Sequence, residues 1–188
     1  MTKDKAIEAG LKLFFQKGYG NVGLTEILKT AEIPKGSFYH HFGSKDDFIR
    51  EVLDKYSSSG LADFKALLLE NKTKTPKERI YHFYAQRTDE IEAEEFNKGC
   101  LLGDSCNQGG LSEDSMNFVD QQLGKWQMVI ELCLDEAKSL GQLNEQADTR
   151  MLAAVIQNGW EGALLRMKAS KSRQPLDDFL ASIDLLVP

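Results

Sequence analysis

The sequence predicts an all-α protein of about nine helices. Apolar residues recur at spacings of three and four along nearly all of its 188 residues, which is the period of a helix. No stretch of the length of a strand alternates apolar with polar residues. Glycines and prolines such as Gly43 and Pro175 stand where one periodic segment gives way to the next.

The first 42 residues are expected to form three helices. The first carries apolar residues at i, i+4, i+7 and i+8 and ends before Gly18, a common stop for a helix. The second spans 24–31 and cannot continue past Pro34, because the residue before a proline avoids helical angles. A very short third helix follows over 35–42.

Longer helices are expected in the rest of the chain. Gly43 interrupts the pattern, and Ser44-Lys45-Asp46-Asp47 then has the spacing of a capping box, which opens a long helix through Tyr56. Residues 71–76 form a polar linker. Further helices are expected over 77–96, from Ser112 to Gly141, over 151–167 and from Pro175 onward, whereas 99–110 is expected to be irregular or a short helix.

Charge divides the chain unevenly. The net charge is -6, yet residues 1–55 hold nine Lys or Arg against eight Asp or Glu, and the remainder holds 14 against 21. A small near-neutral module therefore precedes a larger acidic one, which is too acidic to bind nucleic acid well.

Composition also limits the setting of the protein. No run of about 18 apolar residues or signal-peptide pattern is present, so we expect a cytoplasmic protein without a membrane partner. The odd number of cysteines fits neither a disulfide scaffold nor a zinc pair, so reduced thiols and no metal or other cofactor are expected. The three are Cys100, Cys106 and Cys133.

The stretch Phe-Tyr-His-His-Phe at residues 38–42 indicates what the small module does. Two short helices joined by a tight turn, with a third before them, outline a helix-turn-helix, whose second helix enters the major groove of DNA. The two phenylalanines are four apart and can face the core together. Tyr39, His40 and His41 then point outward, where they can donate hydrogen bonds to phosphate oxygens.

Two neighbouring residues fit the same interpretation. Gly36 would let the N-terminus of the short helix approach the DNA backbone, where unpaired N–H groups favour an anion. Lys45, in the first turn of the next helix, is unfavourable beside that helix's positive end unless an anion lies opposite. A DNA phosphate is such an anion.

The run LTEILKTAEIPKGSFYHHFGSK at residues 24–45 closely resembles the signature of TetR-type transcriptional repressors. The resemblance implies a helix-turn-helix DNA-binding domain at 1–46 and a helical domain at 47–188 that senses an effector and dimerises. It also implies a homodimer on double-stranded operator DNA. The residues it implies as DNA contacts are Thr25, Lys35, Gly36, Ser37, Tyr39, His40, His41 and Lys45.

This chain departs from the TetR pattern at three positions. Relatives commonly have a threonine near Gly23 that caps the second helix and touches phosphate. They usually have glycine where this chain has Glu32, which implies either a left-handed backbone angle or a different turn. Thr25 stands where relatives often place a base-contacting arginine.

A second motif lies in the acidic part. Gly99-Cys100-Leu101, followed by Leu111-Ser112-Glu113-Asp114, is similar to a TetR subgroup that includes the repressor of N-ethylmaleimide reductase and acrylate-responsive repressors. The similarity implies that Cys100 is a sensor thiol for electrophiles and oxidants, with Lys98 and a helix N-terminus favouring its thiolate. Cys106, six residues on, is a candidate resolving thiol if the loop between the two bends. The alternative is a buried, inert Cys100.

Two further sets of residues are candidates for binding an effector and for forming a dimer. For each set, the alternative is that its residues pack in the protomer's own core. A noncovalent effector would be held by aromatic residues, namely Phe83, Tyr84, Phe118 and Trp126. A dimer interface would use the last two helices, through Trp160, Leu164, Met167, Phe179, Leu180 and Ile183.

Two other classes of function compete with a repressor. A helical protein-interaction module would not bind DNA. A cysteine enzyme would need a histidine beside Cys100, yet His82 has no paired acid and the other two histidines lie on the DNA-facing helix. Those two also diverge by about 100° on a helix, which makes a poor metal site. The sequence therefore favours a repressor released by a small molecule or by modification of Cys100, and not an enzyme.

Overall fold

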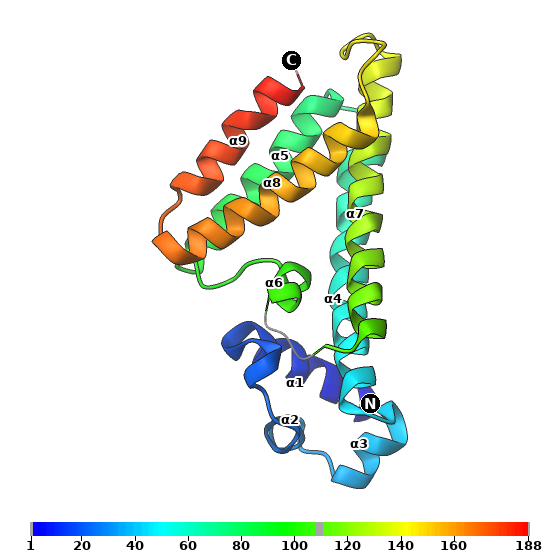
Figure 1. Cartoon of the computed structure of the whole chain (residues 1–188), viewed down its shortest axis with the longest axis vertical. Coiled ribbons are helices and arrows are strands. Elements are labelled where there is room, and N and C mark those ends of the chain that lie inside the picture. The colour runs from blue at the N-terminus through cyan, green and yellow to red at the C-terminus, as the bar shows by residue number, and fades with distance from the viewer. Residues whose placement is uncertain (1, 108–110, 188) are drawn as a thin grey trace. The chain divides into compact units, whose positions relative to one another are not determined.

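The computed structural model describes residues 2–107 and 111–187, within which it has nine α-helices and no strand. The all-α prediction is confirmed, and part of the expected irregular segment 99–110 lies outside the described residues. None of the described helices could span a membrane. The helices in Figure 1 are α1 (Thr2–Lys17), α2 (Leu24–Ala31), α3 (Lys35–Phe42), α4 (Lys45–Lys65), α5 (Pro76–Ala93), α6 (Leu101–Asn107), α7 (Glu113–Ser139), α8 (Thr149–Ser170) and α9 (Gln174–Leu186).

The chain forms two compact units. The N-terminal unit comprises Met1–Gly60 with Leu101–Leu123, and the C-terminal unit comprises Leu61–Cys100 with Gly124–Pro188. This division differs from the expected boundary after residue 46. The observed division falls within α4, between Gly60 and Leu61, and α6 and the first turns of α7 belong to the N-terminal unit.

Aromatic side chains fill the core of the N-terminal unit. The ring of Phe48 on α4 lies 5.2 Å from that of Phe38 and 5.0 Å from that of Phe42, centroid to centroid. Phe14 of α1 packs against the same ring at 6.1 Å. Gly10 makes this approach of α1 to α4 possible, since a Cβ there would lie only 2.6 Å from the Cζ of Phe48.

The C-terminal unit packs α5 and α8 against α9. Its α5 begins at a capping box, in which the Glu78 N–H donates to Thr75 Oγ1 (3.3 Å) and the Thr75 N–H donates to Glu78 Oε2 (2.7 Å). Pro76 takes the first helical position, where its missing N–H costs nothing. The expected linker at 71–76 therefore ends where the helix begins.

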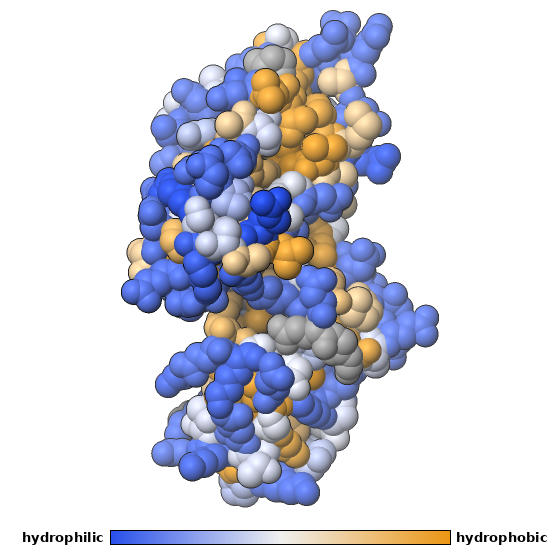
Figure 2. All heavy atoms as spheres, turned by 60° about the vertical axis from the view of Figure 1, so that its left-hand side comes forward, coloured by the Kyte–Doolittle hydropathy of each residue, from blue (hydrophilic) through white to orange (hydrophobic). Residues whose placement is uncertain are grey.

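The six residues expected at a dimer interface lie in the core of the C-terminal unit. Each has at most 8% of its surface exposed, so the alternative role in the protomer's own core is what the structure shows. Helical period placed them on the apolar face of their helices, and that face packs inward. Figure 2 shows apolar surface among hydrophilic side chains. The exposed large apolar residues of α8 and α9 are Met151, Val155, Leu165 and Leu185.

Candidate nucleic-acid interface and sensor segment

Helix α3 has one buried side and one exposed side, as its spacing predicts. Phe38 and Phe42 are buried, with 0% and 4% of their surface exposed. Tyr39 is 45% exposed and His40 is exposed. The ammonium of Lys35 lies 5.9 Å from the centre of the Tyr39 ring, so a cation, a phenol and an imidazole share the outer side of α3.

The N-terminus of α3 is open. Its cap is Pro34, which makes no side-chain hydrogen bond to the first turn. Gly36 is exposed, and a Cβ added there would meet nothing within 4 Å. Packing within the protomer therefore does not require glycine at position 36. The absence of a side chain leaves the first-turn N–H groups accessible to an anion.

The three departures from the family pattern lie at the two ends of α2. Glu32 adopts the left-handed conformation (φ 55°, ψ 45°), so the backbone keeps the usual turn without the usual glycine. Gly23 is the N-cap of α2 and makes no side-chain cap. Thr25 is exposed in the first turn of α2.

Lys45 begins α4 beside a satisfied helix cap. Ser44 Oγ accepts from the Asp47 N–H at 3.0 Å, and its hydroxyl donates to Asp47 Oδ2 at 2.6 Å. That hydrogen bond, followed by the contact with Arg50, holds the pKa of Asp47 below its ordinary value. Asp47 therefore stays anionic within its own turn, and Lys45 supplies a positive charge near the end of α3.

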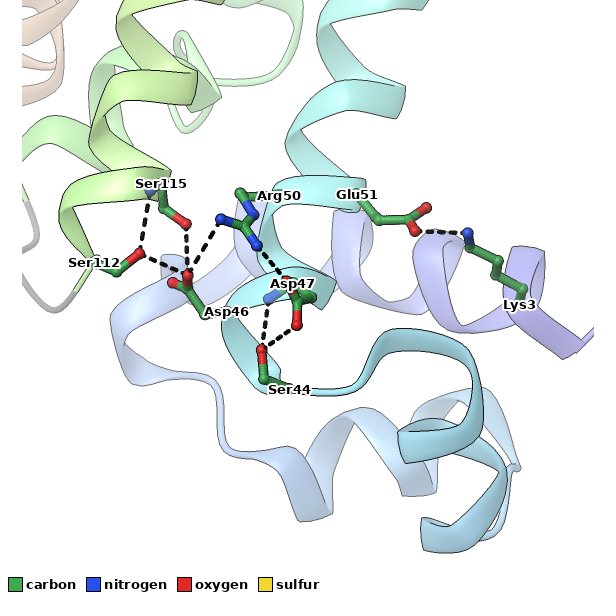
Figure 3. A network of polar contacts seen from close by, with 8 residues as sticks. All are labelled: Lys3, Ser44, Asp46, Asp47, Arg50, Glu51, Ser112 and Ser115. Atoms are coloured by element: carbon green, nitrogen blue, oxygen red, sulfur yellow. Dashed lines mark hydrogen bonds and ion pairs between the residues drawn. The ribbon is translucent and has the colours of Figure 1, made fainter.

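Asp46 joins α4 to α7, as Figure 3 shows. Its Oδ2 accepts from Ser112 Oγ at 2.7 Å and from Ser115 Oγ at 2.8 Å. Partial burial raises the pKa of Asp46, but the two serine hydroxyls outweigh burial and hold the pKa below its ordinary value. The sequence pattern indicates Asp46 and Ser112 only as helix-start residues, because their pairing spans 66 positions.

Cys100 ends a loop with an unusual backbone. It is partly buried and stands directly before α6. Glu95 and Phe96 both have left-handed φ angles, 56° and 57°, although neither is glycine. Lys171 holds this loop, because its Nζ donates to the Phe96 carbonyl (3.2 Å) and to Asn97 Oδ1 (2.9 Å).

Lys168 of α8 lies against the residue before the cysteine. A Cβ on Gly99 would be 2.7 Å from Lys168 Cε and 2.9 Å from its Nζ, so the missing side chain leaves room for the ammonium group. Lys98, which the sequence suggested for this role, instead pairs with Glu94 at 2.6 Å. The sequence does not indicate Lys168, because it lies far along the chain from Cys100. The one local signal for a close neighbour is the glycine that precedes the cysteine.

Tyr84 lies near both Cys100 and Glu161 in the C-terminal unit. The Tyr84 hydroxyl is buried, which raises its pKa, and the charges of Glu161 and of a Cys100 thiolate raise it further. Tyr84 therefore stays a neutral phenol, able to donate a hydrogen bond, at the pH of a cell.

The other two cysteines differ in accessibility. Cys106 is exposed on α6, where its Sγ donates to the Leu102 carbonyl at 3.6 Å, and it belongs to the N-terminal unit. Cys133 is fully buried on α7, and burial raises its pKa to about 11, so its thiol stays protonated near neutral pH.

The expected effector residues do not all belong to one unit. Phe83 and Tyr84 are buried, Trp126 is partly buried, and rings connect them through Phe64, which lies 4.3 Å from Phe83 and 4.9 Å from Trp126. Phe118 is partly buried on the stretch of α7 that belongs to the N-terminal unit.

Comparison with known families identifies the chain. The model for bacterial regulatory proteins of the tetR family matches residues 6–52, and the model for the tetracyclin repressor-like C-terminal domain matches residues 76–183. This chain belongs to the TetR family. The N-terminal match contains the whole helix-turn-helix, and the C-terminal match contains Cys100 and Lys168.

Individual relatives of this TetR-family chain are transcriptional regulators. It is 30% identical to the HTH-type transcriptional repressor DhaR of Mycobacterium sp. (strain GP1), over 100% of this chain and 93% of DhaR. It is 34% identical to the transcriptional regulator AcuR of Cereibacter sphaeroides, over 95% of this chain and 82% of AcuR. The crystal structure of reduced E. coli NemR superposes with a TM-score of 0.90 at 29% identity, covering 100% of this chain and 98% of that one.

These matches confirm the resemblance seen in the two sequence motifs. The protein is a TetR-type transcriptional regulator with a helix-turn-helix, and the subgroup resemblance is supported by likeness to AcuR and NemR along almost the whole chain. The relatives named above are regulators of transcription, which is the class of function that the α3 surface favours over an enzyme.

Proposed function

We propose that this TetR-family protein represses transcription by binding operator DNA as a homodimer and is released when an electrophile modifies Cys100. The observation that carries the sensing step is the position of Lys168. Its ammonium lies against Gly99, one residue from a partly buried thiol. A neighbouring cation stabilises a thiolate, which is the nucleophilic form of cysteine.

DNA binding is assigned to α3 and its two flanking turns. Lys35, Gly36 and Ser37 form the first turn, which in a helix-turn-helix faces the base edges. Tyr39, His40 and His41 supply donors to the phosphates on either side. Lys45 contacts the strand from the start of α4, and Thr25 does so from α2.

The homodimer would form through the outer faces of α8 and α9. Met151, Val155 and Leu165 lie 4 and 10 positions apart in sequence and are 53%, 44% and 60% exposed. Leu185 of α9 is 85% exposed. An operator with two half-sites needs two recognition helices related by a two-fold axis, spaced about 34 Å apart.

The sensing chemistry is a conjugate addition. The Cys100 thiolate attacks the β-carbon of an α,β-unsaturated carbonyl, and an S–C bond forms as the π electrons move to the α-carbon, which takes a proton from water. The sulfur thereby changes from an anion to a neutral thioether with added bulk. We infer that the lost charge and added volume beside Lys168 and Tyr84 change the spacing of the two α3 helices in the dimer.

A gel shift on the upstream region of the gene tests this proposal. N-ethylmaleimide should release the unaltered protein from the DNA. The Cys100→Ser variant should bind equally well and resist release, while Cys106→Ser and Cys133→Ser should still be released. Release of Cys100→Ser by the same reagent would contradict the assignment of the sensor.

A noncovalent effector is the second candidate trigger, because the rings of Phe64, Phe83 and Trp126 are in continuous contact. In that case an unreactive analogue such as N-ethylsuccinimide should release Cys100→Ser from DNA as well as the unaltered protein.

A further inference from the structure

The end of α5 carries charges that oppose its own helix dipole. Asp89, Glu90 and Glu92 lie in its last two turns, beside the negative end of the helix, and no basic residue stands in the last turn. Glu94 and Glu95 follow directly. Cations from another element are therefore expected to hold this end of α5 and the sensor loop, residues 94–99, that leads from it to Cys100.

The sensor loop begins with a backbone that glycine normally adopts. The Glu95 N–H donates to the Glu92 carbonyl at 2.9 Å and the Phe96 N–H donates to the Ile91 carbonyl at 3.0 Å, which is the Schellman pattern of a helix end. Glu95 has φ 56° at the position where glycine is usual, and Phe96 repeats the left-handed angle at 57°. Such a backbone persists when the surrounding contacts hold it.

The end of α8 and the turn before α9 supply those contacts. Lys171 Nζ donates to the Phe96 carbonyl at 3.2 Å and to Asn97 Oδ1 at 2.9 Å. Lys171 is the C-cap of α8 and is itself left-handed, with φ 49°. In the described part of the chain, three of the four non-glycine residues with positive φ thus meet at this point, so unusual backbone is concentrated where Lys171 holds the loop. Two carboxylates of α5 accept from Arg173 Nη1, at 2.9 and 2.5 Å, namely those of Asp89 and Glu92.

The same end of α8 also carries the cation next to the thiol. Lys168 stands three positions before Lys171, and its ammonium lies against Gly99. Gly99 is only two residues beyond Asn97, so the contacts of Lys171 determine where Gly99 and Cys100 lie relative to Lys168. Lys171 can therefore act on the thiol through the loop and through Lys168, without touching the sulfur.

We propose that Lys171 is a positioning residue for the sensor thiol: it holds the sensor loop in the left-handed conformation that places Gly99 against Lys168, and thereby sets the reactivity of Cys100. Its regulatory meaning rests on the proposed function, in which Cys100 is the sensor. The reactivity itself is measured without DNA, so its outcome is separate from the release of the operator by N-ethylmaleimide.

Labelling of the full-length protein with iodoacetamide, followed by mass spectrometry of the peptide that contains Cys100, tests the proposal. Lys171→Met keeps an unbranched side chain at the left-handed position and removes the ammonium. At pH 7 it should slow labelling by about threefold or more, which corresponds to a rise of about half a unit in the thiol pKa. The pH at which labelling is half-maximal should rise accordingly, which a change in accessibility alone would not produce.

Lys138→Met is the matched control. Lys138 Nζ also donates to a backbone carbonyl, that of Ala147 at 3.0 Å, but this contact precedes the first residue of α8. Lys171 follows the last of the 22 residues of that helix, so the two contacts lie at opposite ends of about 33 Å of helix. Labelling of Cys100 in Lys138→Met should match that of the unaltered protein.

A double variant separates positioning from a direct effect of charge. If Lys171 acts through Lys168, the Lys168→Met, Lys171→Met variant should label no more slowly than Lys168→Met alone. A direct effect of the Lys171 charge on the thiol would instead make the two losses in rate multiply.

Asn97→Ala protects the test against misfolding of Lys171→Met. It removes one acceptor of Lys171 from an exposed position and should slow labelling in the same direction by a smaller factor, because the Phe96 carbonyl remains. The proposal is overturned if Asn97→Ala or a folded Lys171→Met labels as fast as the unaltered protein. It is also overturned if the losses from the two lysine variants multiply, or if Lys138→Met slows labelling as much.

Discussion

Gly36 and Gly124 allow a residue-scale test of the DNA surface. Both are exposed helical glycines, and a Cβ at either would meet nothing within 4 Å in the protomer. Alanine should therefore stabilise each helix by up to about 1 kcal/mol. We expect Gly36→Ala, but not Gly124→Ala, to weaken operator binding about tenfold or more, because the added methyl group obstructs the approach to the DNA backbone.

Thermal unfolding and fluorescence anisotropy on one DNA fragment would measure both effects. Equal operator affinity in the two alanine variants would remove Gly36 from the interface.

Lys168 supports a second residue-scale prediction. Replacing it by methionine removes the cation that lies against Gly99, so the thiol pKa of Cys100 should rise and its alkylation near neutral pH should slow. Lys98→Met is the matched control, because that ammonium is paired with Glu94. Rates of iodoacetamide labelling between pH 6 and about pH 10 would follow the thiolate, whose ordinary pKa is about 8.5. If Lys98→Met slows labelling more than Lys168→Met does, Lys98 is the residue that stabilises the thiolate.

At the scale of elements, the sequence predicted the helix starts and missed the contacts between helices. The starts of α3, α4 and α5 depend on Pro34, Ser44 and Thr75, each within four residues of what it caps, so local patterns suffice. The Asp46 pairing with α7 and the position of Lys168 depend on residues distant in sequence, which no spacing rule brings together. The spacing of apolar residues along a helix likewise does not distinguish a face that packs in the protomer's core from one that forms a dimer interface.

The contact of α4 with α7 should depend on pH. The pKa of Asp46 is lower in the folded protein than in the unfolded chain, so its contribution to stability is present above the unfolded value of about 3.9 and disappears as pH falls through the folded value. Asp46→Asn should cost about 1–2 kcal/mol at pH 7, because the acceptor of two serine hydroxyls loses its charge. Urea unfolding of both proteins should give free energies of unfolding that converge below about pH 4.

Ser115→Ala is the companion to that measurement. In a double-mutant cycle, its cost should be smaller in the Asp46→Asn background than in the unaltered protein. Additive costs, or a difference between Asp46→Asn and the unaltered protein that persists in acid, would show that the pair does not hold α4 to α7.

For the whole molecule, dimerisation and DNA binding should be lost together. Leu165 on α8 and Met128 on α7 are each 60% exposed, so a charge at either is tolerated by the protomer. Leu165→Glu should give monomers in light scattering and should abolish tight operator binding, because one recognition helix then acts without its two-fold mate. Met128→Glu should remain a dimer. Dimers of Leu165→Glu, with Met128→Glu monomeric, would move the interface to α7.

The most direct measurement of the central claim is the affinity of a folded Tyr39→Ala, Lys45→Ala double variant for the upstream operator, titrated by anisotropy at several salt concentrations. Both residues are assigned to phosphate contacts, so the variant should bind far more weakly, and the slope of log affinity against log salt should shrink by about one for the lost lysine. A variant that binds as tightly as the unaltered protein, with the same salt slope, would show that α3 does not face the DNA.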